Sequence, residues 1–144
     1  MEKIVKLIES DLKKLETSVD RLITTKVGFI KEIINYIIKS GGKRMRPILV
    51  LLSSKLCGYK GKDSIPLAAI VEFVHTATLL HDDVVDNAKT RRGASTANTI
   101  WGNEASVLVG DFLYAKSFEL MADYSNQEII RAMAQTTKKL SEGE

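Results

Sequence analysis

The apolar residues of this chain recur at the spacing of an α-helix along almost its whole length. Between positions 4 and 22 they return every three or four residues, so they lie on one face of a helix. Positions 27–38 carry a broader stripe of five isoleucines beside Phe29. No segment of the sequence alternates apolar and polar residues, and no internal repeat is visible. The pattern predicts an all-α fold.

Glycine and proline residues divide this pattern into six predicted helices. The sequence Ser-Gly-Gly at 40–42 terminates the second helix. Pro47 suits the first turn of the third helix, which should end before Gly58. A basic loop is expected between the fourth and fifth helices. The six predicted helices cover 4–22, 27–38, 47–57, 66–87, 103–124 and 126–140, and the loop covers 89–95.

The size of the chain allows one domain, positions 1–144, with one core. It has 144 residues, of which 44% are hydrophobic. The single cysteine, Cys57, cannot form an internal disulfide, which favours a reducing, cytoplasmic setting. The longest nearly apolar run, 65–80, contains Glu72 and His75 and is shorter than the ~18–20 residues of a membrane span. We therefore expect no stable membrane insertion.

The positive charge of the chain is concentrated in two short segments. The formal net charge is +3, and much of it comes from the run 43–46 and the pair 91–92. Short basic loops suit small anions such as phosphates better than a long polyanion. Aromatic residues make up 6% of the chain, which leaves few platforms for stacked bases. A nucleic-acid partner is not expected.

Three carboxylates lie together near the end of the predicted helix 66–87. Asp82 and Asp86 are four residues apart, so they lie on one face of the helix, while Asp83 points to the side. Like charges at this spacing repel, and a divalent cation removes the repulsion. Mg²⁺ typically binds through one or two carboxylates together with substrate phosphates. The residues by themselves fit either a metal site or a solvated helix end.

Basic residues flank these carboxylates in the sequence. Lys43 and Arg46 follow two glycines and precede a predicted helix N-terminus, a combination that suits a diphosphate. Arg91 and Arg92 come just after the acidic helix end and could reach back to phosphates held there. The alternatives are an exposed basic turn and a pair of surface arginines that neutralise the helix end.

Two histidines belong to the same predicted helix. His75 lies two turns before Asp82 on a similar face, so it could donate to a second phosphate group. The alternative for His75 is a hydrogen-bonded core histidine. His81 points elsewhere on the helix, and no role is expected for it.

Together these segments resemble the trans-isoprenyl diphosphate synthases, or polyprenyl synthetases. The resemblance runs over essentially the whole chain, with four motifs in order at compatible spacing. The nearest likeness is to the octaprenyl-type synthases of quinone biosynthesis. The matching strings are GGKRMRP at 41–47, EFVHTATLLHDDVVD at 72–86, RRG at 91–93 and ASVLVGDFLYAKSF at 105–118.

The resemblance implies an isoprenoid synthase-type helical bundle, of which this chain would hold roughly the first six helices. It implies a Mg²⁺-dependent prenyltransferase, cytoplasmic and homodimeric, that condenses isopentenyl diphosphate with an allylic prenyl diphosphate. The product would be a long-chain all-trans polyprenyl diphosphate. Mg²⁺ and arginines would stabilise the departing diphosphate of the allylic substrate, and an apolar channel would keep water from the cation.

The resemblance also assigns roles to individual residues. Asp82 and Asp86 are implied as Mg²⁺ ligands, and Arg91 as the contact to the allylic diphosphate, so these three are the expected catalytic residues. Isopentenyl diphosphate would be bound by Lys43, Arg46, His75 and Arg92.

Product length is implied by the helix face below the carboxylates. Ala77 and Thr78, five and four residues before Asp82, are small. Family members that stop early tend to carry aromatic residues there. The small pair therefore indicates an open channel and a long product.

The chain departs from the family in length. Family members are about twice as long, and no second Asp-Asp pair follows Asp86 in this sequence. The family's second aspartate-rich motif, which completes its metal site, is thus missing. We expect a truncated chain that is inactive or nearly so by itself, with one side of its core uncovered.

Two other functions fit parts of the sequence. A non-catalytic subunit, or one half of a split or heteromeric prenyl synthase, would have a similar fold, although such subunits usually lack an intact first aspartate motif. A class I terpene cyclase also uses Asp-Asp-x-x-Asp. It has no isopentenyl diphosphate to bind, so the string at 41–47 and His75 argue against it.

Overall fold

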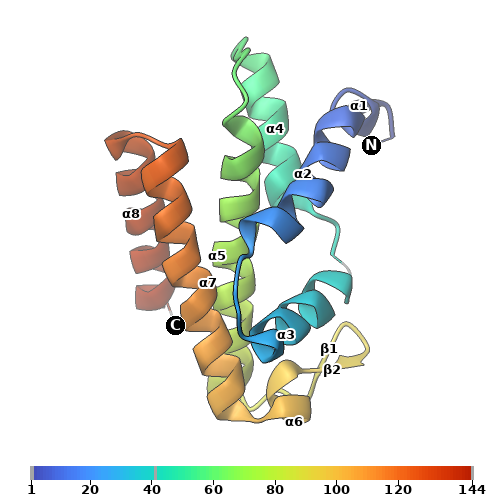
Figure 1. The fold of residues 1–144 in the computed structure, drawn as a ribbon, viewed down its shortest axis with the longest axis vertical. Helices are drawn as coiled ribbons and strands as arrows, with labels where there is room; N and C mark the ends of the chain where they lie inside the picture. Colours follow the sequence, from blue (N-terminus) through green and yellow to red (C-terminus); the bar gives the residue numbers. More distant parts are fainter. Residues whose placement is uncertain (1, 41, 144) are drawn as a thin grey trace.

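A computed structural model describes residues 2–40 and 42–143 of the chain, and it places one long helix at the centre of a helical bundle (Figure 1). That helix is α5 (Ser64–Val85), and α2, α4 and α7 pack against it. The predicted all-α fold is confirmed. The other elements are α1 (Glu2–Lys6), α2 (Glu9–Leu22), α3 (Gly28–Lys39), α4 (Met45–Leu56), β1 (Thr90–Arg91), β2 (Ala94–Ser95), α6 (Ala97–Trp101), α7 (Asn103–Tyr124) and α8 (Gln127–Gly143).

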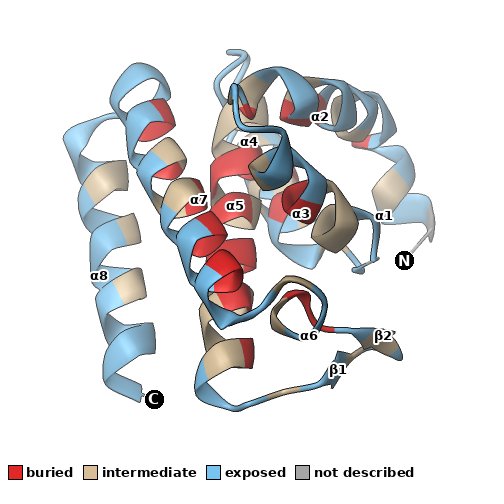
Figure 2. Ribbon diagram, turned by 60° about the horizontal axis from the view of Figure 1, so that its bottom comes forward, coloured by how far each residue is buried: buried red, intermediate tan, exposed pale blue. Residues whose placement is uncertain are grey.

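The core lies on α5 because this helix is apolar on nearly all sides. Nine of its described residues are buried, and Phe73 is the largest of them at 1% exposed. Alanines at 68, 69 and 77 let the neighbouring helices approach its backbone closely. Figure 2 shows buried residues gathered on α5 and on the side of α7 that faces it. A helix of this kind is typical of a protein interior.

The apolar run 65–80 is part of a longer helix than the sequence indicated. By length and composition alone, α5 could cross a membrane, with a mean hydropathy of 1.3 over its most apolar window. The prediction that this segment is too short and too polar for a span is therefore wrong. The core helix of a soluble protein has the same length and composition. In this fold α5 contributes its apolar residues to the core.

The N-terminal helix is divided, which the periodicity did not predict. The segment 4–22 forms α1 and α2, separated by a turn at Leu7 and Ile8. Ile8 is 0% exposed, whereas Leu7 is 67% exposed. The turn places Ile8 in the core as the residue that precedes α2.

The loop predicted at 89–95 contains a small β-hairpin, and the helix after it was not predicted. β1 and β2 are antiparallel and are joined by Arg92 and Gly93. Both turn residues have positive φ, +53° and +80°, as a type I′ hairpin turn requires. Tyr36 of α3 donates a hydrogen bond from its hydroxyl to the carbonyl oxygen of Ser95 at 2.7 Å, which ties the hairpin to α3.

The outer face of the bundle carries exposed apolar residues. None of the described residues of α8 is buried, and Leu140 is 54% exposed. On α7, Leu108 and Phe118 are 62% and 53% exposed. Figure 2 shows α8 at one edge of the bundle, next to α7. These exposed residues lie outside the core cluster, so the prediction that one side of the core is uncovered stays a prediction.

Candidate functional site

Basic side chains from three separate segments meet in one pocket beside α5. The pocket has a volume of about 590 Å³ and lies between the end of α3, the start of α4, the middle of α5 and the hairpin turn. Its lining includes all four residues predicted to bind isopentenyl diphosphate. Gly41, which belongs to the same motif, lies outside the described residues. The polar residues of the lining are Lys43, Arg44, Arg46, Glu72, His75, Thr76 and Arg92.

The backbone before α4 turns sharply to bring its basic side chains to this pocket. Arg44 has a φ of +49°, a left-handed conformation that non-glycine residues rarely adopt, and α4 begins directly after it. Gly42 lies against the hairpin turn. A Cβ atom at Gly42 would be 2.6 Å from Nη1 of Arg92. Arg92 can therefore occupy the pocket because position 42 has no side chain.

His75 is neutral at pH 7 in this surrounding. Burial, together with the positive charges of Arg46, Arg92 and Arg91, lowers the pKa of His75 from 6.5 to about 4. A neutral imidazole still has one N–H that can donate to a phosphate oxygen. An arriving anion would favour the protonated form, so the side chain could also take up a proton when a diphosphate binds.

Asp82, two turns beyond His75 on a similar face of α5, borders a second pocket. This smaller pocket of about 140 Å³ is formed by α5, α7 and α8 and includes Thr78, Tyr114 and Leu140. Burial and the charge of Asp82 raise the pKa of Tyr114. Thr78 lies one turn of α5 before Asp82 and lines the same pocket. Ala77 is 0% exposed and belongs to the hydrophobic core.

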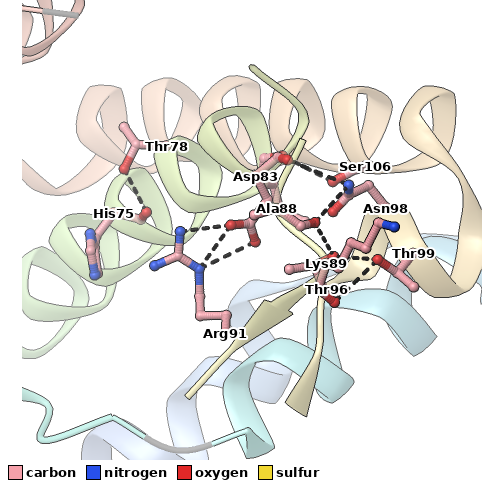
Figure 3. Close-up of polar contacts among 11 residues, drawn as sticks. His75, Thr78, Asp83, Ala88, Lys89, Arg91, Thr96, Asn98, Thr99 and Ser106 are labelled. Carbon is pink, nitrogen blue, oxygen red and sulfur yellow. Dashed lines mark hydrogen bonds and ion pairs between the residues drawn. The ribbon is translucent and has the colours of Figure 1, made fainter. Parts of the chain in front are cut away.

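Asp83 was expected to point aside, and the structure gives it a partner. It is 5% exposed and binds the guanidinium of Arg91 with three hydrogen bonds (Figure 3). Arg91 Nε donates to Oδ1 at 3.0 Å and to Oδ2 at 3.2 Å, and Nη2 donates to Oδ1 at 2.7 Å. Hydrogen bonding to Asp83 is the main cause that raises the pKa of Arg91.

The sequence contained one signal for this pair. Asp83 follows Leu80 and Thr76 at helical spacing, on the buried face of α5. A carboxylate on a buried face needs a cationic or hydrogen-bonding partner. No comparable signal in the sequence pointed to Tyr114.

The segment between α5 and α7 is fixed by hydrogen bonds to backbone carbonyl groups (Figure 3). Thr96 donates from its hydroxyl to the Ala88 carbonyl oxygen at 2.8 Å, and Asn98 Nδ2 donates to the same oxygen at 3.2 Å. At the adjoining turn of α5, Ser106 of α7 donates from its hydroxyl to the Leu80 carbonyl oxygen at 3.0 Å. These bonds hold the hairpin, and with it Arg91 and Arg92, against the end of α5.

His81 connects α5 to α7, although no role was expected for it. Its Nε2 atom is 3.2 Å from the Val107 carbonyl oxygen and 3.3 Å from Oδ1 of Asp111. The imidazole lies against Gly110, where a Cβ atom would overlap it. His81 is therefore a packing and hydrogen-bonding residue between the two helices.

The residues present fit a divalent cation only in part. Within 2–40 and 42–143, no three His, Cys, Asp or Glu side chains gather closely enough to hold a metal by themselves. Asp83 is engaged by Arg91, so Asp82 and Asp86 remain as the carboxylate donors at the end of α5. Two carboxylates are the usual protein share of a Mg²⁺ site that substrate phosphates complete.

A family comparison agrees with the motifs. The sequence model of the family described as Polyprenyl synthetase matches residues 27–144. Among curated proteins, the octaprenyl diphosphate synthase of Haemophilus influenzae is 44% identical over 144 residues, which is 100% of this chain and 44% of that protein. The chain thus spans less than half of the length of the curated relatives it matches.

Solved structures give the same result for the fold. A decaprenyl diphosphate synthase from Rhodobacter capsulatus superimposes with a TM-score of 0.94 at 41% identity, over 99% of this chain and 44% of that one. A polyprenyl synthase from Caulobacter crescentus, complexed with calcium and isoprenyl diphosphate, has a TM-score of 0.94 at 39% identity, over 99% of this chain and 43% of that one. The likeness covers the basic pocket and the aspartates together.

Proposed function

The chain belongs to the polyprenyl synthetase family, and from that premise we propose that it forms the diphosphate-binding part of a long-chain trans-prenyl diphosphate synthase. The reaction would join isopentenyl diphosphate to an allylic prenyl diphosphate. The observation that carries this proposal is the basic pocket, where Lys43, Arg46, His75 and Arg92 lie together. They come from three segments that are distant in the sequence.

The middle and the C-terminal end of α5 would each serve one of the two substrates. The basic pocket lies beside the middle of the helix and has a polar, cationic lining suited to the diphosphate of isopentenyl diphosphate. Asp82, Asp86 and Arg91 lie at its C-terminal end, where the allylic diphosphate would be held. His75, two turns before Asp82, would donate a hydrogen bond to the isopentenyl diphosphate.

Asp82 and Asp86 are the residues that would hold Mg²⁺, and bound Mg²⁺ would supply charge neutralisation for the departing diphosphate. The related synthase from Caulobacter crescentus was solved with calcium and isoprenyl diphosphate, which supports a divalent cation in this role. Arg91 would add hydrogen bonds to the same leaving group. The apolar core residues beneath would keep water away from the allylic cation.

The growing tail would descend along the pocket wall that carries Thr78. This residue lines the same pocket as Asp82, and its small side chain leaves the wall open. We expect Thr78→Phe to shorten the main product, because an aromatic ring would block the path one turn below the carboxylates. Ala77→Phe would instead overpack the core, since Ala77 is 0% exposed. Chromatography of the products and thermal melting of the two variants would separate these effects.

We also propose that the 144 residues alone elongate substrate slowly or not at all. Among residues 2–40 and 42–143 no three His, Cys, Asp or Glu side chains gather to hold a metal, and the relatives' chains are more than twice as long. The exposed apolar residues of α7 and α8 support association with further protein, including the homodimer proposed for the cytoplasmic enzyme. Light scattering of the purified protein would measure its oligomeric state.

A hybrid synthase tests the proposed activity. It joins residues 1–144 to the part of the Haemophilus influenzae octaprenyl diphosphate synthase that the match leaves out. With Mg²⁺, isopentenyl diphosphate and farnesyl diphosphate it should make long polyprenyl diphosphates, and chelation of the metal should stop the reaction. Residues 1–144 alone serve as the comparison. A folded hybrid that binds neither diphosphate would refute the proposal.

A further inference from the structure

Asp83 differs from its two neighbouring aspartates in what it contacts. Its side chain is 8% exposed, and its carboxylate faces Arg91. Asp86, at the end of the helix, is exposed, and Asp82 borders the pocket between α5, α7 and α8. The Asp-Asp-x-x-Asp string thus contains two kinds of carboxylate. One kind is open to a ligand, and the other is bound to a cation of the protein itself.

The hydrogen bonds use one edge of the Arg91 guanidinium. Nε and Nη2 both donate to Asp83, in the forked geometry that fixes the plane of the group. The Nη1 edge points the other way, toward the side of His75 (Figure 3). An arginine side chain without such a partner samples many rotamers, and fixing it before a ligand binds reduces the entropy lost on binding.

The backbone around the pair is held independently of Asp83's side chain. The Ala88 amide donates to the Asp83 carbonyl oxygen at 2.9 Å, and Thr96 and Asn98 donate to the Ala88 carbonyl oxygen. Tyr36 fixes the hairpin from the other side through Ser95. Removal of the Asp83 carboxylate would therefore release the Arg91 side chain while most contacts of the hairpin remain.

We propose that Asp83 is a positioning residue, which holds the Nε–Nη2 edge of Arg91 and leaves its Nη1 edge for the allylic diphosphate. The proposal rests on the function proposed above. It also separates the three aspartates by role, with Asp82 and Asp86 open to the metal and Asp83 acting through Arg91. The charge of Asp83 is compensated within the protein, so it adds little to the repulsion between the other two.

A double-mutant cycle in the hybrid synthase tests this role. The variants are Asp83→Ala, Arg91→Ala and the double variant, with kcat and KM measured for each substrate. We expect Asp83→Ala to raise KM for the allylic diphosphate or lower kcat by about tenfold or more. KM for isopentenyl diphosphate should change less than about threefold. In the Arg91→Ala background, Asp83→Ala should have almost no further effect on kcat/KM, because its partner is already absent.

Two controls separate positioning from stability. Asp11→Asn removes another ion pair between helices, that with Lys55 at 3.1 Å, and should leave both KM values unchanged. Asp83→Asn keeps one acceptor oxygen and should retain more activity than Asp83→Ala. The proposal is overturned if the losses of kcat/KM in the two single variants multiply in the double variant. It is also overturned if Asp83→Ala changes the melting temperature but not the kinetics.

The same experiment shows whether the positioning role of Asp83 or the proposed synthase function has failed. If the unaltered hybrid elongates and the losses multiply, only the positioning role fails. If the hybrid does not elongate, calorimetry with inorganic diphosphate and Mg²⁺ takes the place of kinetics, with the same cycle and the same expected pattern. A folded hybrid that neither elongates nor binds diphosphate would refute both.

Discussion

At the scale of single residues, a methyl group added at Gly42 would contact a side chain of the basic pocket. Gly42→Ala would place a Cβ atom 2.6 Å from Nη1 of Arg92, so the arginine must move. We expect diphosphate affinity to fall about tenfold, which is about 1.4 kcal/mol and the scale of one hydrogen bond to a charged group. Isothermal calorimetry on the hybrid synthase measures it.

Gly28→Ala is the matched control for this change. Gly28 lies in the first turn of α3, and a Cβ atom there would meet nothing within 4 Å. This variant should bind diphosphate as the unaltered protein does and gain up to about 1 kcal/mol of stability. Equal affinities for the two variants would show that Arg92 does not need the space at Gly42.

His75 makes the stability of the fold dependent on pH. Its pKa is about 4 in the folded chain against 6.5 when unfolded, so the unfolded state binds more protons between these values. The stabilisation is complete above pH 6.5 and is lost as the pH falls toward 4. We expect a loss of about 1–2 kcal/mol from this group, less than the full shift would give because solvent reaches the imidazole.

Urea unfolding at several pH values measures this effect. Carboxylates also titrate in this range, so the comparison is with His75→Gln, which lacks the imidazole. The stability of the variant should fall less steeply between pH 6.5 and 4. Parallel curves for the two proteins would show that the surroundings of His75 do not oppose its protonation.

At the scale of the elements, the contact between α5 and α7 depends on a histidine packed onto a glycine. Gly110→Ala would place its methyl group against the His81 imidazole and push the helices apart or displace the ring from the Val107 carbonyl. We expect a loss of about 1–3 kcal/mol in the free energy of unfolding, typical of an overpacked interface. Denaturant unfolding measures it.

The double variant His81→Ala with Gly110→Ala tests the cause. Removal of the imidazole makes room for the new methyl group, so the double variant should be more stable than the sum of the single losses predicts. Additive losses would mean that the alanine acts through the helix backbone alone.

The helices were predictable because their apolar periodicity and their glycine and proline boundaries are local properties of the sequence. The turn that separates α1 from α2 was missed, since Ile8 continues the apolar pattern although the chain bends there. The hairpin was missed because each strand has two residues, too few to show alternation. Arg92 and Gly93 form its turn, and an arginine with positive φ has no signature in the sequence.

The candidate site also has a part that the sequence predicted and a part that it did not. The sequence named the four residues that the structure brings into the basic pocket, because the motifs that contain them are contiguous strings. Their convergence depends on how α3, α4 and the hairpin pack around α5, which no single string contains. The partnership of Asp83 with Arg91 and the position of Tyr114 beside Asp82 arise from tertiary packing and were not predicted.

At the scale of the whole molecule, stability depends on α5, since α2, α4 and α7 all pack against it. Phe73 is its largest buried residue, and Phe73→Ala should reduce the free energy of unfolding by about 3–5 kcal/mol. Val85→Ala on the same helix is the control. Val85 is 70% exposed, so its truncation should change stability by less than about 0.5 kcal/mol. Chemical denaturation of the two variants measures the difference, and similar losses would place the main core elsewhere.

The position of His75 and Asp82 on one continuous helix has a consequence for repeated cycles of elongation. Seven residues at 1.5 Å each separate the two side chains by about 10 Å along the helix axis. A helix held in a packed core keeps this separation whatever the length of the tail. Under the proposed function, the distance between donor and acceptor headgroups is the same in the first condensation and in the last. The depth of the channel alone would then determine the length of the product, and the chemistry of each condensation would be the same.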